Sequence, residues 1–147
     1  MVHNYLNSNF AGYDFQHETM LFENECRKYA FKKEKAIIES PYKNNHKFFI
    51  EFDHIAKADT NGKVFLFDSK YYGRISEANY KQVAYHYFLS NGANGEKNRP
   101  EDIINGLILP TGAQYRSLVH IDRRDIDGVY IQEHYINIRE VMEKYIS

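Results

Sequence analysis

The chain has 147 residues and a formal net charge of −1, and 43% of its residues are hydrophobic, a share typical of globular proteins. A chain of this length fits one domain that buries about two-thirds of its unfolded surface, so we expect a single domain over residues 1–147. The balanced charge excludes a protein whose whole surface is basic enough to grip nucleic acid. Cys26 is the only cysteine, which excludes an internal disulfide, and no apolar run reaches membrane-spanning length, so we expect a cytoplasmic protein without a membrane partner.

The region before residue 48 contains few strong signals. Residues 1–17 are polar and rich in asparagine without a period, so we expect a loosely ordered lead-in. From residue 18 to residue 33 apolar side chains recur at helical spacing, which predicts an amphipathic helix. These side chains are Phe22, Cys26, Tyr29 and Ala30. Ile37 and Ile38 indicate a short strand, and residues 42–47 are typical of a polar turn.

Residues 48–72 have the pattern of a β-hairpin. Two apolar, aromatic-rich runs, 48–56 and 64–72, flank a Thr-Asn-Gly stretch that is typical of a turn. Because side chains alternate along a strand, Asp68 and Lys70 share one face of the second strand. Asp53 shares a face of the first strand with Phe49, Glu51 and Ile55. If these two faces lie on the same side of the sheet, two carboxylates and one ammonium group meet at its end.

The second half of the chain alternates helix and strand signals. Ser76 is the expected N-cap of a helix whose apolar stripe recurs every three or four residues, and a Gly/Asn-rich loop, 91–95, follows it. The stripe consists of Tyr80, Val83, Ala84, Tyr87 and Phe88. Strands are predicted over 105–109, 118–121 and 129–131, and a last helix over 138–146. This order predicts an α/β fold with a mixed central β-sheet flanked by helices.

Asp53, Asp68 and Lys70 are suited to phosphodiester hydrolysis. Mg²⁺ prefers hard oxygen ligands and keeps several waters, so one or two carboxylates and a backbone carbonyl are sufficient protein ligands. The ion would polarise a phosphate oxygen and lower the pKa of a bound water, while Lys70 would hold that water and offset the developing charge. A carboxylate two residues before a lysine also occurs by chance about once in a chain of this length. A charged pair at a strand exit is often only a solvated strand end.

The sequence around these residues resembles a nuclease superfamily. The run VFLFDSKYY, preceded by EFDHI and followed by KQVAYHY, is similar to the PD-(D/E)XK nucleases, and most closely to the nuclease subunits of LlaJI-type and McrBC-like restriction systems. NGLILP and the closing IQEHYINIREVMEKYI also fit that pattern. The similarity spans residues 21–146 and is most distinctive over 48–88. It implies a restriction-endonuclease-like core and a Mg²⁺-dependent endodeoxyribonuclease, with Mn²⁺ as a substitute and DNA as substrate.

The resemblance also implies roles for individual residues. Asp53 and Asp68 become metal ligands, Lys70 becomes the catalytic lysine, and Ser69 offers its backbone carbonyl to the metal. Gln82 becomes a helix-borne residue of the site, with Lys81 and Tyr85 as further candidates. Phe52 stands where the superfamily has a proline, which is a departure from its pattern.

The superfamily often adds a glutamate from the first helix. Its spacing implies Glu23 as a further metal ligand, because this residue directly follows an apolar Leu-Phe pair. A helical wheel instead brings Glu25 nearer to the apolar stripe of Phe22 and Tyr29. We take Glu23, with a solvated helix face as the alternative for both glutamates.

Other polar residues fit structural roles better. His54 follows Asp53 and points to the opposite face of its strand, so we expect a buried or hydrogen-bonded histidine rather than a ligand. His86 and His120 are similarly isolated. The aromatic pair Tyr71 and Tyr72 is typical of packing at a strand end. The run IDRRDID, with Arg123 and Arg124, alternates in charge and indicates a self-compensated turn, and Arg116 is a further candidate for a phosphate contact.

Partners follow from the resemblance and from the balanced charge. The resemblance implies a GTP-hydrolysing partner, and sequence recognition is expected in another domain or subunit. A homodimer is compatible with double-strand cleavage, which usually needs two active sites. The alternatives are a same-superfamily nuclease that acts on branched DNA, DNA ends or RNA, and a catalytically silent module that keeps the fold and binds protein or nucleic acid.

Overall fold

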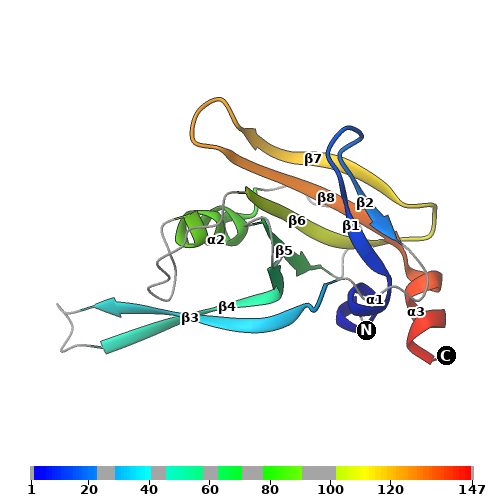
Figure 1. Ribbon diagram of the computed structural model, residues 1–147, viewed down its shortest axis with the longest axis horizontal. Helices are drawn as coiled ribbons and strands as arrows, with labels where there is room; N and C mark the ends of the chain where they lie inside the picture. The colour runs from blue at the N-terminus through cyan, green and yellow to red at the C-terminus, as the bar shows by residue number, and fades with distance from the viewer. Residues whose placement is uncertain are drawn as a thin grey trace.

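The structure is a computed structural model that describes residues 2–22, 29–40, 46–57, 63–70, 78–90 and 102–146; for 36–40, 46–48 and 144–146 it describes the backbone only. A six-stranded sheet in the order β3-β4-β5-β6-β8-β7 forms its centre, and β1 and β2 form a separate hairpin (Figure 1). The sheet strands are β3 (Lys32–Ser40), β4 (His46–Lys57), β5 (Lys63–Ser69), β6 (Asp102–Thr111), β7 (Arg116–Arg123) and β8 (Val129–Asn137). The remaining elements are α1 (Val2–Asn9), β1 (Phe10–Asp14), β2 (Thr19–Phe22), α2 (Tyr80–Ser90) and α3 (Ile138–Ile146).

The sheet combines antiparallel and parallel pairs. Strand β4 runs antiparallel to both β3 and β5, whereas β6 is parallel to both β5 and β8. A parallel neighbour requires a crossover connection, and α2 lies in the connection between β5 and β6. Strand β7 closes the sheet antiparallel to β8. The prediction of an α/β fold with a mixed sheet flanked by helices is therefore confirmed.

The two faces of the sheet are covered by different elements. On one face, α1, α3 and the β1–β2 hairpin pack over Phe65 and Phe67 of β5, with Phe10 of β1 in edge contact with both rings. On the other face, α2 packs over Val64 and Leu66. The period of two along β5 thus divides its side chains between two cores. We call these sides the α1 face and the α2 face.

The N-terminal region differs from its prediction. Residues 2–14 are not a loosely ordered lead-in, because α1 and β1 bury Tyr5, Leu6 and Phe10 in the main core. The helix predicted over 18–33 is also wrong, since residues 19–22 form β2 and residues 32–40 form β3. An apolar side chain of this region instead contacts the central sheet, as in the edge contact between Tyr29 and Phe65 of β5.

Most predicted elements from residue 48 onward are confirmed. The hairpin of β4 and β5 forms, α3 has its predicted bounds, and α2 and the three later strands form with shifted ends. The N-cap of α2 is Asn79 rather than Ser76, because its Oδ1 accepts a hydrogen bond from the Gln82 N–H at 2.9 Å. Ser76, the 60–62 turn and the 91–95 loop lie outside the described residues.

Strand β6 continues through Pro110, where the sequence predicted its end. The pairing with β5 stops at Ile108, whereas the pairing with β8 continues to Thr111. Among the described residues, β6 therefore pairs at Pro110 only with β8. A proline, which lacks an N–H, is tolerated where a strand has one neighbour.

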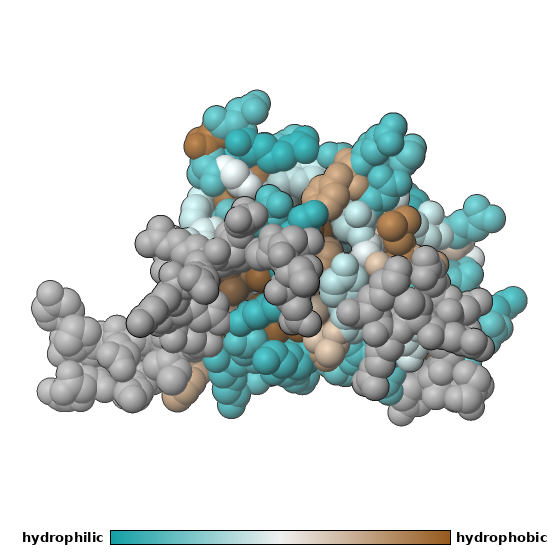
Figure 2. Space-filling model, viewed as in Figure 1, coloured by the Kyte–Doolittle hydropathy of each residue, from teal (hydrophilic) through white to brown (hydrophobic). Residues whose placement is uncertain are grey.

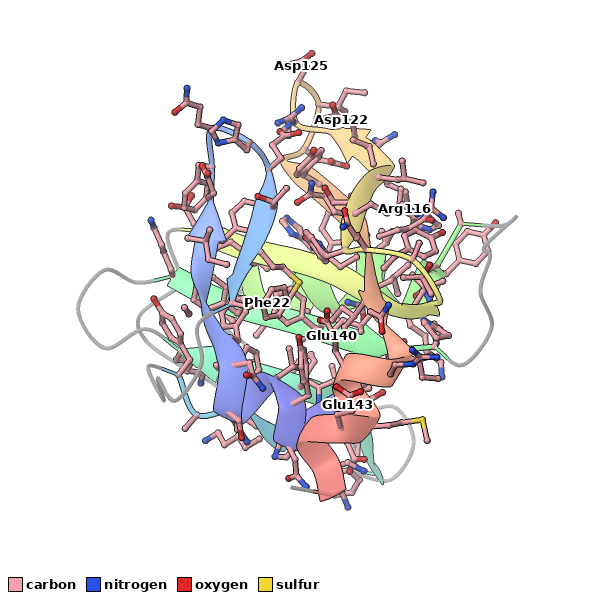
Figure 3. All side chains as sticks on the ribbon, turned by 90° about the vertical axis from the view of Figure 1, so that its right-hand side faces the viewer. Phe22, Arg116, Asp122, Asp125, Glu140 and Glu143 are labelled. Atoms are coloured by element: carbon pink, nitrogen blue, oxygen red, sulfur yellow. The ribbon has the colours of Figure 1, made fainter. Side chains whose placement is uncertain are left out.

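The surface combines hydrophilic and hydrophobic residues. On the face in Figure 2, hydrophobic residues are interspersed among hydrophilic ones. Figure 3 looks onto the hairpin side, where Phe22 lies near the middle and Asp122 and Asp125 lie at the end near the β7–β8 turn. No helix within the described residues is long and apolar enough to cross a membrane.

Candidate functional site

The register of β4 and β5 brings Asp53 opposite Asp68. His54 pairs with Phe67 and Ile55 pairs with Leu66, so the next antiparallel pair in the same register is Asp53 with Asp68. Directly opposed residues of an antiparallel pair point to the same side of the sheet. Both carboxylates therefore lie on the α2 face, at the end of the pairing.

A β-bulge at this point sets the direction of Asp53. On the other edge of β4, Lys32 pairs with Ile55 and Glu34 pairs with Phe52, so Lys33 alone faces Asp53 and His54. The bulge interrupts the alternation of side chains along β4. The sequence predicted that Asp53 shares a face with Phe49, Glu51 and Ile55, and this is correct for Ile55 alone. Ile50 and Phe52 also pack on the α2 face. By the alternation of side chains, Phe49 and Glu51 therefore lie on the opposite side.

The two carboxylates and Lys70 form one compact cluster. Lys70 Nζ lies 2.6 Å from Asp68 Oδ2, with the two side chains 20% and 10% exposed. The hydrogen bond to Asp68, with burial and the charge of Asp68, raises the pKa of Asp53 to about 6. Burial disfavours the charged form of Asp68, but the hydrogen bonds from Asp53 and Lys70 outweigh it and hold the pKa of Asp68 below its ordinary value. At neutral pH two like charges therefore share a confined site.

Further cations lie around the carboxylates. Lys33 of β3 lowers the pKa of Asp53, and Lys81 of α2 lowers that of Asp68. Tyr85 of α2 packs its ring on Phe52 at a centroid distance of 5.0 Å. Burial and the two carboxylates raise the pKa of Tyr85. Lys33 lies at the end of the helix predicted over 18–33, so the sequence did not indicate it as a site residue.

Gln82 does not join the carboxylates. Its side chain is fully buried, and its Nε2 donates to Asn105 Oδ1 at 2.6 Å and to the Gly106 carbonyl at 3.3 Å. Asn105 Nδ2 donates back to the Gln82 carbonyl at 3.0 Å. These bonds attach α2 to β6, so Gln82 acts on the site only through the position of its helix.

A second set of hydrogen bonds holds the first turn of α2. The Asn79 N–H donates to His120 Nε2 at 3.0 Å, which leaves His120 Nδ1 as the donor to Glu133 Oε2 at 2.9 Å. Glu133 also accepts a hydrogen bond from Tyr135 at 2.6 Å. The turn that precedes Lys81 is therefore anchored to β7 and β8, and His120 is not isolated.

His54 and Ser69 form a hydrogen-bonded chain on the α1 face. His54 is buried, its Nε2 lies 2.6 Å from Ser69 Oγ, and its Nδ1 lies 3.4 Å from His3 Nδ1. Burial lowers the pKa of His54 to about 4, so the ring is neutral at neutral pH. The prediction of a buried, hydrogen-bonded His54 is confirmed. The chain also turns the Ser69 side chain away from Asp68.

The tautomers in this chain follow from Asn7. Its Oδ1 accepts from the Phe31 N–H at 2.6 Å and its Nδ2 donates to the Phe31 carbonyl at 3.2 Å, which defines the orientation of the amide. The same Nδ2 donates to His3 Nε2 at 3.2 Å, so the proton of His3 lies on Nδ1 and points to His54 Nδ1. His54 therefore donates from Nε2 to Ser69, and every ring nitrogen in the chain has a partner.

Other sequence candidates lie outside the described residues or form local ion pairs. Glu23, Glu25, Tyr71 and Tyr72 lie outside the described residues. Arg124 pairs with Asp122 at 2.8 Å and Arg123 pairs with Asp127 at 3.0 Å, so the expected self-compensated turn is confirmed. Among the described residues, no three His, Cys, Asp or Glu side chains are grouped around a common metal position. A cation at the cluster would therefore have Asp53 and Asp68 as its carboxylate ligands.

The chain matches no protein-family model and no curated protein. The case for a function therefore rests on the geometry of the Asp53, Asp68 and Lys70 cluster.

Proposed function

We propose that this chain is a Mg²⁺-dependent endodeoxyribonuclease with a restriction-endonuclease-like core. A mixed sheet flanked by helices, which is the architecture implied by the resemblance, supports this proposal. Three of the residues with implied roles, Asp53, Asp68 and Lys70, come from two adjacent strands and meet at one end of their pairing.

The observation that carries the proposal is the opposed carboxylate pair. Asp53 retains its proton up to about pH 6 because its carboxyl group faces that of Asp68. Asp68 Oδ2 has Lys70 as its ion-pair partner and no further hydrogen bond among the described residues. The two carboxylates are hard oxygen donors that repel one another. A divalent cation would stabilise the pair, because it would take the place of the proton that the two groups share at low pH. The residues present thus fit Mg²⁺ or Mn²⁺.

Each side chain has a defined task in this proposal. A bound Mg²⁺ would supply Lewis acidity toward a phosphate oxygen and a bound water. Asp53 and Asp68 would bind and orient the ion, with the Ser69 carbonyl as the third protein ligand implied by the resemblance. The Lys70 ammonium would orient the attacking water and offset negative charge in the transition state. Lys33 and Lys81 would attract the DNA backbone toward the carboxylates.

Recognition of a DNA sequence belongs elsewhere in this proposal. A net charge of −1 leaves little general attraction for DNA, so binding would depend on the local lysines and on a GTP-hydrolysing or DNA-recognition partner. Two copies of the chain would be needed to cut both strands. This arrangement describes the cleavage domain of a restriction system.

A nicking assay on plasmid DNA with Mn²⁺, with and without EDTA, tests the proposal. We expect Lys70→Ala and Asp68→Ala to lower the rate by about 10³-fold, because each removes a charge that acts in the transition state. Lys57→Ala is the matched control, since Lys57 pairs with Glu34 at 3.5 Å on the surface of β4. Cleavage by Lys70→Ala at the parental rate would refute the assigned role.

The alternatives have their own measurements. A panel of linear, branched and RNA substrates separates an endodeoxyribonuclease from a nuclease for another substrate. Calorimetric titration with Mn²⁺ separates both from a silent module, which would take up no metal through Asp53 and Asp68.

A further inference from the structure

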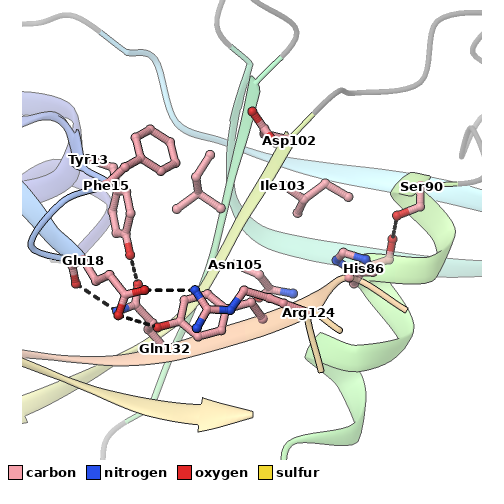
Figure 4. Close-up of a pocket in the computed structure, with 13 residues that line it drawn as sticks. Tyr13, Phe15, Glu18, His86, Ser90, Asp102, Ile103, Asn105, Arg124 and Gln132 are labelled. Carbon is pink, nitrogen blue, oxygen red and sulfur yellow. Dashed lines mark hydrogen bonds and ion pairs between the residues drawn. The ribbon is translucent and has the colours of Figure 1, made fainter. Parts of the chain in front are cut away.

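A cavity lies at the end of the central strands that is opposite to the carboxylates. It has a volume of about 470 Å³ and lies between the β1–β2 turn, the start of β6, the end of α2 and the start of β8 (Figure 4). Asp68 is five residues along β5 from Lys63, which pairs with Asp102 at the cavity, and this corresponds to about 16 Å of strand. The cavity is within the range of small-molecule sites and is separate from the proposed metal site.

Arg124 presents a flat face at this cavity. Three of its five N–H groups bond to Asp122 and Glu18, at 2.8 to 3.0 Å, so most of the edge of the guanidinium that would bind an anion is occupied. One face covers the Tyr130 ring at 3.9 Å. The surface of Arg124 that is left for recognition is therefore the outer face of a planar, delocalised cation, which stacks on flat aromatic groups.

Aromatic and aliphatic groups form the adjoining walls. Tyr13 and Phe15 lie on the hairpin side with their rings in edge contact at 5.0 Å, and Ile103 and Ile104 lie at the start of β6. The Phe15 side chain is 53% exposed, so this aromatic wall is accessible from solvent. A planar ring would find contacts on the hairpin, on β6 and on Arg124.

The polar groups at the cavity favour a neutral, hydrogen-bonding ligand. His86 lines the cavity from α2, and its Nδ1 is buried without a hydrogen-bond partner among the described residues. Ser90 and Asn105 line the same region. Among the described residues, the carboxylates of Glu18, Asp102 and Asp122 outnumber the cations Arg124 and Lys63, so their charge opposes a phosphate or a carboxylate.

We propose that this cavity binds an uncharged planar nitrogen heterocycle of the nucleobase class, stacked on Arg124 and hydrogen-bonded near His86. The base is held as a nucleoside, because a phosphate group would meet the surrounding carboxylates. This site does not depend on the proposed nuclease activity.

The test is an NMR titration of the full chain with adenosine, guanosine, cytidine and thymidine, and with their 5′-monophosphates. We expect saturable shifts of cavity residues with at least one nucleoside, and weaker binding of its monophosphate. Arg124→Lys keeps the charge but loses the flat face, and should weaken nucleoside binding about tenfold. Arg123→Lys is the matched control, because Arg123 pairs with Asp127 and does not line the cavity.

A second variant keeps the proposal testable if Arg124→Lys does not fold. Phe15→Ala removes an exposed wall of the cavity and should weaken nucleoside binding while the amide spectrum stays dispersed. Three outcomes overturn the proposal: no saturable shift with any nucleoside, equal nucleoside binding by Arg124→Lys and the parental chain, or monophosphate binding that Arg123→Lys and Arg124→Lys weaken equally.

Discussion

The two faces of the β4–β5 pair carry opposite kinds of polar cluster, one residue apart in the sequence. On the α2 face Asp53 meets Asp68, so two like charges are brought together and one carboxyl group holds its proton up to about pH 6. On the α1 face His54 and Ser69 belong to a chain in which each histidine nitrogen has a partner. The first cluster brings like charges together, and the second is complete as it stands.

In the proposed function, this difference separates a metal-binding arrangement from a structural one. A satisfied polar cluster stabilises the fold, because no buried donor or acceptor lacks a partner. A pair of opposed carboxylates costs stability, and it is retained where a ligand relieves the repulsion. Substitutions on the two faces should therefore change stability in opposite directions.

The largest effect on stability is expected on the α1 face. His54→Ala should lower the free energy of unfolding by about 3 kcal/mol, since it leaves a cavity and removes the partners of Ser69 and His3. Urea unfolding at pH 7 measures this value. Ser69→Ala, which removes one hydrogen bond, should lower the free energy of unfolding by about 1 kcal/mol. An equal loss of stability in the two variants would contradict the hydrogen-bonded chain of His3, His54 and Ser69.

Metal affinity should depend on pH through Asp53. The pKa of about 6 means that the proton must leave before a cation binds, so Mn²⁺ affinity should fall about tenfold for each pH unit below 6 and level off above 7. Calorimetric titration from pH 5 to pH 8 measures the profile. A flat profile down to pH 5 would show that Asp53 does not contribute a ligand.

Removal of the repulsion on the α2 face should stabilise the protein. The raised pKa of Asp53 means that the folded state holds this proton more tightly than the unfolded state, so stability falls as pH rises from about 4 to about 6. Asp53→Asn should therefore raise the free energy of unfolding by about 1 kcal/mol at pH 7, a value reduced for solvent screening, and by little below pH 4. The same variant should lose Mn²⁺ binding. Destabilisation at pH 7 would be the opposite of our expectation.

The smallest effect is expected at Lys33. Its charge lowers the pKa of Asp53 from the far side of the bulge, so Lys33→Ala should raise this pKa further. NMR titration of the Asp53 carboxyl carbon measures the change. The effect should disappear in about 1 M salt because Lys33 is exposed, and persistence in high salt would indicate a structural cause instead.

Local patterns in the sequence predicted the middle and the C-terminal part of the fold well. The helical period over residues 80–88 and the alternation around 48–56 and 64–69 depend on neighbours in the sequence, and α2, β4 and β5 are present. The predicted stripe of α2 is wrong, however, because α2 buries Gln82, His86 and Leu89, whereas Tyr80 and Tyr87 of the stripe are exposed. The same alternation placed Asp68 and Lys70 on one face, where their side chains meet at 2.6 Å. It also predicted that His54 points away from Asp53.

The sequence by itself determined the β4–β5 hairpin, the location of α2 and α3 and the shared face of Asp68 and Lys70, because these depend on periods of two and of about 3.6 residues. Only the tertiary structure decided that residues 19–22 and 32–40 are strands, that Lys33 faces a bulge at Asp53, and that Gln82 bonds to β6. Each of these outcomes depends on contacts between segments far apart in the chain. Such contacts override a local pattern whenever the distant core supplies more buried surface than the local element does.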